Sequence, residues 1–197
     1  MAEKADVTEV QQEALDYGIA IALQRMGQFG EALEVLNSLM TRNPHLAFEI
    51  QIADLEVDSG QTDAALERLS GLYESFQGNH AISMAYSEAL LHENVPGRAE
   101  TASTILRRQL LTHPEDPSLW ALYARASNTA GDTVRAREAI AESYFLRGGV
   151  YEALAQLREL INSDELDYYE RARISARLNE IQIQMVKLDM DEDQPPP

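Results

Sequence analysis

The side chains of this sequence best suited to bind a metal ion or to transfer a proton are its four histidines, His45, His80, His92 and His113. A zinc-peptidase helix carries two histidines one turn apart with a glutamate between them, so that both imidazoles face one metal ion. No pair of histidines here has that spacing. His92-Glu93 comes nearest, but Pro96 follows closely and would interrupt a helix. The histidines therefore predict no metal site.

Other motifs that carry chemistry are also missing from the sequence. It contains no cysteine, which removes thiolate metal ligands, disulfides and a cysteine nucleophile. It has no glycine-rich phosphate loop and no nucleophile elbow, since the Arg-Gly-Gly run at 147–149 is typical of a turn between helices. We therefore predict that this chain is not an enzyme and that it holds no cofactor.

A repeat of 33 or 34 residues organises the chain. The recurring positions are Gly27, Ala32 and Leu36; Gly60, Ala65 and Leu69; Gly97, Ala102 and Leu106; Gly131, Ala136 and Ile140; and Gly148, Ala153 and Leu157. The fifth copy begins only 17 residues after the fourth, so one helix must close one repeat and open the next. A period of this length predicts a stack of paired helices.

Each period has room for two helices and two short turns. Residues 29–42 carry apolar side chains at intervals of three and four, which form one stripe along a helix. Gly27 before this helix suits a left-handed turn, and Pro44 after it ends the helix. The same signals predict ten helices, at residues 6–26, 29–42, 46–59, 62–76, 80–93, 98–112, 117–129, 132–147, 150–162 and 164–187.

This pattern resembles the tetratricopeptide repeat (TPR), a helix–turn–helix unit of 34 residues. The match is best in the stretch WALYARASNTAGD, which supplies Trp120, Tyr123, Ala124 and Gly131 at the family's spacing. It departs at Gln77, where the family has a proline. The resemblance implies an all-α fold, a right-handed α-α superhelix of about four to five repeats and about ten helices, with a C-terminal capping helix.

Four segments are expected along the chain. They are an N-terminal lead-in at 1–12, the TPR solenoid at 13–162, the C-terminal capping helix at 163–187 and a tail at 188–197. The tail contains the run DMDEDQPPP, which has no apolar stripe to pack against a core. We therefore expect this acidic, proline-rich tail to be disordered.

The capping segment carries a second resemblance. Residues 164–184 read DELDYYERARISARLNEIQIQ and follow a YEALAQLREL helix. This run is similar to the end of periplasmic zinc metalloproteases of the BepA/YfgC type, in which a TPR domain follows a peptidase domain. The resemblance implies a periplasmic location, a role in outer-membrane protein assembly and quality control, and partners from the assembly machinery and its substrates. Zinc would belong to the peptidase domain, which this chain lacks.

In a TPR solenoid the first helix of each repeat lines a concave groove that binds protein. The family register places the following residues there: Tyr17, Gln24, Arg25, Ile50, Asp54, Asp58, Tyr86, Glu93, Asn94, Arg125, Asn128, Arg135 and Glu138. Members that bind acidic chaperone tails have Lys and Asn where this sequence has Tyr17 and Ile21, so such a tail is not the expected ligand. The mixed groove better suits an extended segment or a helix.

Charge narrows the choice of partner. The net charge is −17, with 33 acidic and 16 basic residues. Nucleic-acid binding depends on Lys and Arg against phosphates, so we expect no nucleic acid as partner. No apolar run approaches the ~18–20 residues of a membrane span. The first residues also show no basic and apolar leader, which leaves the cytoplasm as the alternative location.

Three functions remain open from the sequence. The preferred one is a protein-interaction scaffold that binds a polypeptide segment in the groove. The second is a cis-regulatory domain of a zinc metallopeptidase whose catalytic part is missing from this chain. The third is a cytoplasmic TPR adaptor unrelated to proteolysis. An upstream coding segment with a zinc-peptidase motif would favour the second, and a cleaved leader would count against the third.

Overall fold

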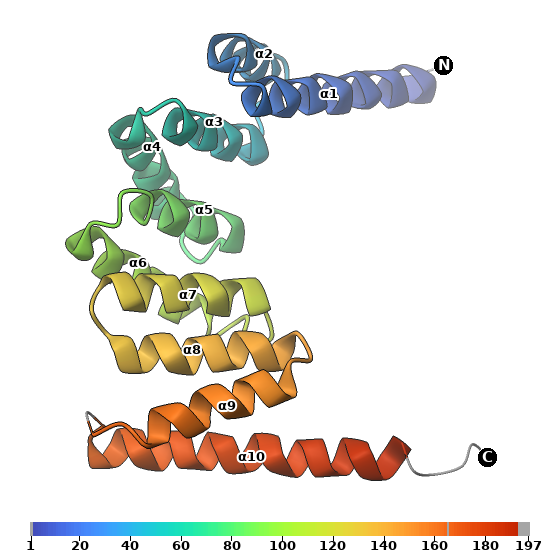
Figure 1. Cartoon of the computed structure of the whole chain (residues 1–197). Helices are drawn as coiled ribbons and strands as arrows, with labels where there is room; N and C mark the ends of the chain where they lie inside the picture. The colour runs from blue at the N-terminus through green and yellow to red at the C-terminus, as the bar shows by residue number, and fades with distance from the viewer. Residues whose placement is uncertain (1, 165, 193–197) are drawn as a thin grey trace. The chain divides into compact units, whose positions relative to one another are not determined.

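The computed structural model describes the backbone of residues 2–164 and 166–192 and the side chains of residues 8–164 and 166–186. Within these ranges it contains ten α-helices and no strand (Figure 1), which confirms the all-α prediction. The helices are α1 (Ala2–Arg25), α2 (Phe29–Arg42), α3 (Leu46–Asp58), α4 (Thr62–Ser75), α5 (His80–Leu90), α6 (Pro96–Gln109), α7 (Pro117–Thr129), α8 (Thr133–Leu146), α9 (Val150–Ile161) and α10 (Tyr168–Glu192).

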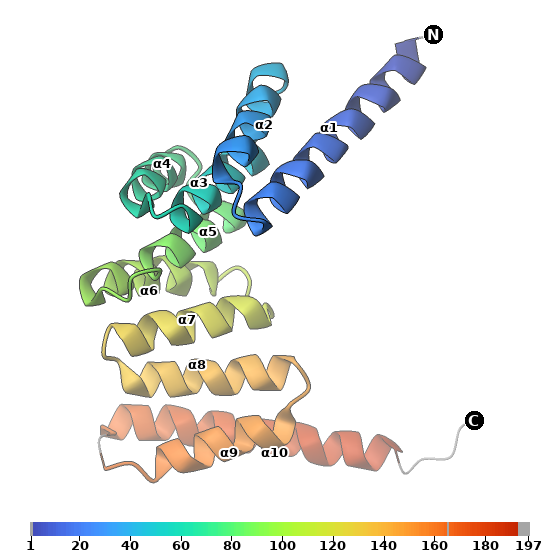
Figure 2. The ribbon, with the colours of Figure 1, turned by 45° about the horizontal axis from the view of Figure 1, so that its top comes forward.

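The chain forms two compact units, Met1–His92 and Glu93–Pro197, which we describe separately. In the first unit each helix from α1 to α4 packs on the next one, and α3 also contacts both α1 and α5. In the second unit α6 to α10 pack in the same consecutive order. Figure 2 shows α7 and α8 of this unit side by side, joined by a short turn. Both units are therefore stacks of helical hairpins, as the repeat predicts.

The core of the first unit forms where α2 packs between α1 and α3. Leu36 and Leu39 of α2 are fully buried, and they share a cluster with Phe48 and Ile52 of α3. Ala32 is also fully buried, so its small side chain permits a close approach of the helices. Each buried Leu contributes about 1.5–3 kcal/mol to the free energy of folding, so apolar packing is the main force that holds this stack together.

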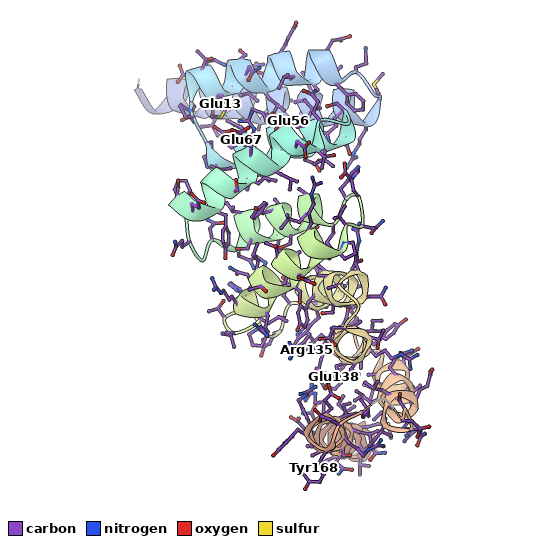
Figure 3. The ribbon with its side chains drawn as sticks, turned by 90° about the vertical axis from the view of Figure 1, so that its left-hand side faces the viewer. Glu13, Glu56, Glu67, Arg135, Glu138 and Tyr168 are labelled. Atoms are coloured by element: carbon purple, nitrogen blue, oxygen red, sulfur yellow. The ribbon has the colours of Figure 1, made fainter. Side chains whose placement is uncertain are left out.

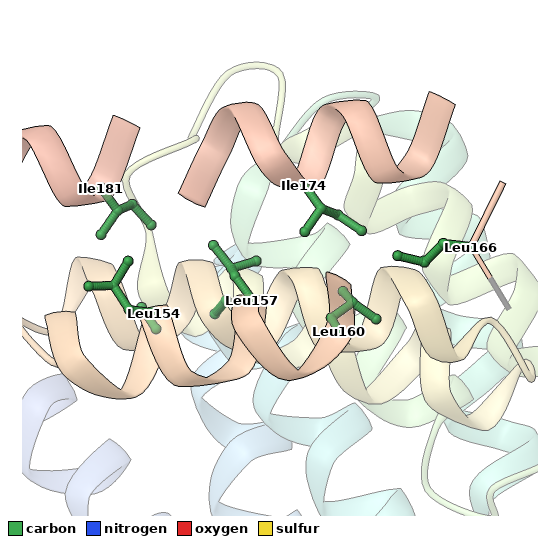
Figure 4. Packing of buried hydrophobic residues seen from close by; sticks show 8 residues of the cluster. Leu154, Leu157, Leu160, Leu166, Ile174 and Ile181 are labelled. Atoms are coloured by element: carbon green, nitrogen blue, oxygen red, sulfur yellow. The ribbon is translucent and has the colours of Figure 1, made fainter. Parts of the chain in front are cut away.

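The core of the second unit is closed by α10. Ile174 and Ile181 lie two turns apart on this helix, are fully buried, and pack on Leu154, Leu157 and Leu160 of α9 (Figure 4). The predicted capping helix is therefore present and covers the apolar side of the last hairpin.

The two terminal helices extend further toward the chain ends than the sequence predicts, and the last one begins at Tyr168 instead of at residue 164. The first begins at Ala2, so the expected lead-in at 1–12 is continuous with the helix from residue 2 onward. The last extends to Glu192, so residues 188–192, which we expected in a disordered tail, are helical. No Gly or Pro interrupts this stretch before Pro195, so no helix-breaking residue ends the helix at 187. The rest of the predicted tail, residues 193–197, falls outside the described residues.

Glycine is required at the turn between α7 and α8. Gly131 has a φ of +89°, a left-handed conformation that residues with a Cβ adopt only at a cost. Gly27 in the turn after α1 has the same conformation, with a φ of +76°. The left-handed turn predicted at Gly27 is therefore confirmed.

The third repeat departs from this pattern. Gly97 lies inside α6, and the positive φ falls three residues earlier, on Asn94 (φ +53°). The residue before a proline is held in an extended conformation, so Val95 precedes the helix that starts at Pro96. The predicted helix at 80–93 ends three residues early, at Leu90. The sequence also placed α6 two residues too late.

Candidate functional site

Three predicted groove residues of the first unit bind one another directly, and a fourth joins them through one bridging side chain. Gln24 of α1 is buried, and its Nε2 donates hydrogen bonds to Asp54 Oδ2 (2.9 Å) and Asp58 Oδ2 (2.7 Å) of α3. The bridge is Gln51 of α3, whose Nε2 donates to Gln24 Oε1 (2.7 Å) and whose Oε1 accepts from the Tyr17 hydroxyl (3.0 Å). Tyr17–Gln51 and Gln24–Asp58 are each separated by 34 residues, so one repeat length joins α1 to α3.

The groups that this network exposes at the surface are acidic. The amide of Gln24 is used inside the network, whereas Asp54 and Asp58 are exposed and lie one turn apart. Burial, with the negative charge of Asp54 as a smaller cause, raises the pKa of the Tyr17 hydroxyl and keeps it protonated as a donor. The surface therefore offers carboxylate oxygens to a ligand that carries N–H groups. Sequence reasoning missed Gln51, although its spacing of three from Asp54 and seven from Asp58 places it on the same stripe.

The other predicted residues of the first unit lie outside this network. Arg25 is exposed in the last turn of α1, and Ile50 is half-buried on α3, one residue before the network stripe. Tyr86 of α5 is half-buried and its ring centroid lies 5.8 Å from that of Tyr73. Burial raises the pKa of the Tyr86 hydroxyl as well. These three residues therefore do not extend the network.

A second arrangement lies in the second unit, where a cavity of about 350 Å³ opens between three helices. We call it the α8–α10 groove. Its lining residues are Trp120 and Tyr123 of α7, Arg135, Glu138, Ala139 and Glu142 of α8, and Arg173 and Arg177 of α10. Figure 3 shows the two that the sequence predicted, Arg135 and Glu138, next to each other. The structure therefore adds three charged side chains and two aromatic ones to them.

Two bidentate ion pairs cross this groove from α10 to α8. Arg173 donates from Nε and Nη2 to the carboxylate of Glu138 at 2.8 and 2.7 Å. Arg177 donates in the same way to Glu142 at 2.6 and 2.7 Å. The hydrogen bonds from Glu142 raise the pKa of Arg177 above its usual range, so this pair stays charged. Both pairs span 35 residues, close to one repeat length.

Local hydrogen bonds hold α7 and α8 in place beside these pairs. Asp132 Oδ1 accepts a hydrogen bond from the backbone N–H of Arg135 (3.0 Å) and caps α8. Ser143 Oγ donates to the carbonyl oxygen of Pro117 (2.9 Å), which joins the end of α8 to the start of α7. Trp120 Nε1 donates to the carbonyl of Pro114 (2.7 Å), which fixes the indole at the groove. The groove is therefore formed before any ligand binds.

Every guanidinium that lines the groove is paired with a carboxylate. Arg173 and Arg177 bond Glu138 and Glu142, and Arg135 bonds Asp132 (3.2 Å). Such pairs keep unused donor and acceptor sites, which suit the N–H and C=O groups of a polypeptide backbone. No group of three or more His, Asp or Glu side chains that could hold a metal ion occurs in the described part of the chain. Nor is any of its helices long and apolar enough to cross a membrane. The arrangement suits binding of a peptide.

The remaining predicted residues lie elsewhere. Arg125 and Asn128 are exposed on α7, but Arg125 follows Tyr123 by two residues and so leaves the helix on nearly the opposite side from the groove. Glu93, predicted at the end of a helix, and Asn94 after it both lie in the connection between α5 and α6, where Glu93 pairs with Arg98 (2.8 Å). Within the second unit, the predicted residues therefore do not share one face.

Comparison with known proteins agrees with the fold. A family model described as tetratricopeptide repeat matches residues 56–126. A MamA fragment from Desulfovibrio magneticus is similar with a TM-score of 0.56 at 17% identity, over 92% of this chain and 97% of that one. TTC0263, a thermophilic TPR protein in Thermus thermophilus, has a TM-score of 0.53 at 21% identity, over 84% and 98%. The predicted TPR fold class is confirmed.

Among curated proteins, the chain is similar to two beta-barrel assembly-enhancing proteases. It is 26% identical to that of Yersinia pestis and 25% identical to that of Escherichia coli K12, each over 172 residues. These alignments cover 87% of this chain but only 35% and 34% of the relatives, so the chain spans about a third of their length. The predicted resemblance to this kind of protease is therefore confirmed, over a share of the relatives that is consistent with a TPR domain alone.

Proposed function

We propose that this TPR chain is a protein-interaction scaffold of the bacterial periplasm, and that it binds a polypeptide segment in the α8–α10 groove. The observation that carries the proposal is the preformed groove in which paired Arg and Glu side chains lie beside Trp120. The similarity to beta-barrel assembly-enhancing proteases over most of the chain supports a ligand from outer-membrane protein assembly.

Binding in this proposal depends on rigidity. The bidentate pairs Glu138–Arg173 and Glu142–Arg177 fix α10 against α8, so the protein loses little conformational entropy when a ligand enters. An unfolded β-barrel polypeptide has backbone N–H and C=O groups that are not yet paired in a sheet. The exposed edges of the two ion pairs supply partners for these groups, and the indole of Trp120 contacts apolar side chains of the ligand.

The experiment measures fluorescence anisotropy of a labelled outer-membrane β-barrel protein, diluted from urea into a solution of the full chain. Arg135→Glu changes a half-exposed residue at the groove, and we expect it to weaken binding about fivefold, the equivalent of about 1 kcal/mol. Arg158→Glu makes the same charge change on an exposed position of α9 and should leave the affinity unchanged. Equal affinities of the two variants would reject the groove as the binding site.

A second measurement addresses the ligand class and the location. An equally unfolded cytoplasmic protein without β-barrel structure should bind at least about tenfold more weakly, a difference of about 1.4 kcal/mol. Equal binding would leave the chain a general polypeptide binder and remove the link to outer-membrane assembly. Recovery of the native protein only in the cytoplasmic fraction of cells would instead favour the adaptor function.

The length of the relatives supports a second candidate function, in which this chain regulates a peptidase in cis. The chain covers about a third of proteins whose name describes them as proteases. An in-frame zinc-peptidase motif in the surrounding gene would support this function. The test would then compare peptide hydrolysis by the full protein and by its Arg135→Glu variant. Unchanged hydrolysis would contradict regulation through the groove.

A further inference from the structure

One face of α1 exposes apolar side chains at helical spacing. Leu15, Ile19 and Met26 are 62%, 49% and 72% exposed, and Ala22 lies exposed between the last two. These four residues, which we call the α1 stripe, follow one another at intervals of four, three and four. Leu15, Ile19 and Ala22 therefore lie along one side of α1, and Met26 continues this line one residue beyond the end of the helix. Three large apolar side chains aligned in this way mark a surface that is suited to a partner.

The repeat shows what kind of element this surface is built to contact. Phe48, Ile52 and Leu55 of α3 lie 33 residues after the first three residues of the α1 stripe. All three are buried, and they share a cluster with residues of α2, the helix that precedes them. The equivalent face of α1 is therefore shaped to pack against a helix. None of the helices described in the first unit covers it.

The surface beside the α1 stripe is acidic. A cavity of about 430 Å³ between α1 and α2 shares Ile19 with the stripe. Its lining residues are Asp16, Ile19, Leu23, Glu31, Glu34, Val35, Ser38 and Arg42. Three carboxylates thus face one guanidinium, and that of Arg42 is bonded to Asp16. An occupant that covers Glu31 and Glu34 must bring positive charge, because a carboxylate that loses water without gaining a cation is costly.

The chain itself contains a helix with the chemistry that such an occupant needs. In the second unit α10 buries Ile174 and Ile181, which lie two turns apart, against α9. Beside this apolar stripe, Arg173 and Arg177 bond the carboxylates of the neighbouring helix α8. In the second unit, a helix with an apolar stripe flanked by arginines therefore covers a hairpin that has carboxylates beside its apolar side.

We propose that the α1 stripe and the acidic cavity beside it bind an amphipathic helix of a partner protein, one that carries Lys or Arg next to an apolar stripe. A second copy of this chain fits the surface less well, because two copies would bring Glu31 and Glu34 of both together. Each chain also carries a net charge of −17, which opposes self-association.

The test uses the full chain and two labelled helical peptides of about 18 residues, about five turns. Both peptides have the same leucine stripe, flanked by lysines in one and by glutamates in the other. We expect fluorescence anisotropy to show binding of the lysine peptide, at least about tenfold tighter than the glutamate peptide and weakened by salt. Equal binding of both, or no binding of either, would overturn the proposal.

Variants localise the binding. Leu15→Glu combined with Ile19→Glu should weaken the lysine peptide about tenfold, whereas Leu111→Glu, at a Leu that is 82% exposed in the second unit, should not. Glu31→Lys combined with Glu34→Lys should shift the preference toward the glutamate peptide. Circular dichroism spectra verify that each variant is folded. Equal losses in the stripe variant and in Leu111→Glu would reject the stripe as the site.

Two further results separate this proposal from its rivals. Arg135→Glu should leave peptide binding at the α1 stripe unchanged. The two sites are thus tested separately: rejecting the α1 stripe would not reject the α8–α10 groove, and rejecting the groove would not reject the stripe. Sedimentation equilibrium should show a monomer at the concentrations used. A dimer that Leu15→Glu dissociates would assign the stripe to a second copy and overturn the proposed partner.

Discussion

Arg177 of α10 and Glu142 of α8 form a bidentate ion pair although 35 residues separate them in the sequence. Arg173 and Glu138 form the same pair one turn away with the same separation. Equal separations mean that α8 and α10 run in the same direction and in one register, with long side chains joining them. The network of Tyr17 and Gln24 with α3 joins α1 to α3 at nearly the same separation. In each unit, polar side chains therefore join two helices whose bonded residues are about one repeat length apart, α1 and α3 in the first unit and α8 and α10 in the second.

The ion pair of Arg177 and Glu142 should stabilise the second unit measurably. Because both side chains retain some exposure, we expect a coupling free energy of about 1 kcal/mol in a double-mutant cycle with Arg177→Ala and Glu142→Ala. The more exposed pair of Arg173 and Glu138 should give about 0.5 kcal/mol. Urea unfolding followed by circular dichroism gives both values. A coupling of zero, or one larger for the exposed pair, would contradict this order.

Removal of the buried side chain at Ile174 should destabilise the protein strongly. Ile174→Ala leaves a cavity against α9, and we expect a loss of about 2–4 kcal/mol in the free energy of unfolding. Ile183→Ala, on the same helix but 57% exposed, should cost less than about 0.5 kcal/mol. Thermal and urea unfolding of the two variants test this contrast. Similar losses would show that α10 does not close the core as described.

The turn glycine between α7 and α8 should tolerate no side chain without strain. Gly131→Ala forces a Cβ into a left-handed conformation, so we expect a loss of about 1 kcal/mol or more in unfolding free energy. Gly97→Ala is the matched control, because Gly97 is helical and no atom lies within 4 Å of an added Cβ. The control should be neutral or slightly stabilising. A reversed order of the two melting temperatures would contradict the turn geometry.

The free energy of unfolding should fall at alkaline pH, partly because the Tyr17 hydroxyl loses its proton. Burial raises the pKa of its hydroxyl above the ordinary 10.0, so the unfolded chain releases this proton first as the pH rises. The stabilising contribution is complete below the unfolded pKa of about 10 and is lost as the pH rises through the folded pKa. Tyr17→Phe should therefore lose less unfolding free energy than the native chain between about pH 9 and pH 11.

The Tyr86→Phe variant provides a second test of this titration, because burial raises the pKa of the Tyr86 hydroxyl also. Each single variant should reduce the alkaline loss, and the double variant should reduce it further. The ultraviolet absorbance of tyrosinate reports the ionisation itself. An alkaline loss that is identical in the native chain and the double variant would assign it to other groups.

Most of the helix positions could be predicted from the sequence because they depend on neighbouring residues. Gly131 and Gly27 stop a helix through their own φ angles, and Pro44 stops one through its ring. The prediction was wrong at Gly97, where Pro96 starts a helix early and Asn94 takes the left-handed position. The repeat pattern favours a turn at the glycine, whereas the proline before it favours a helix start. The repeat pattern does not show which of these two local signals is the stronger.

The candidate site was predictable only in part. The repeat register placed Gln24, Asp54 and Asp58 on one surface, and the structure joins them by hydrogen bonds. It also placed Arg135 and Glu138 together, which both line the α8–α10 groove. Arg173 and Arg177 of α10 bond carboxylates of α8, and Arg177 also bonds an acid on its own helix, Glu180. Helical spacing identifies partners within a helix but not across two of them.

The repeat, the all-α fold and the absence of catalytic motifs could be recognised without coordinates, because each follows from spacing or from residue types. Which equivalent positions are covered depends on the packing of the helices. Leu15 and Phe48 occupy the same place in successive repeats, yet Leu15 is exposed and Phe48 is buried. The reason is that Phe48 of α3 packs with residues of α2, whereas no helix described in the first unit covers Leu15 of α1. Burial and ion pairing depend on neighbours a whole repeat away, and only the folded chain brings those neighbours into contact.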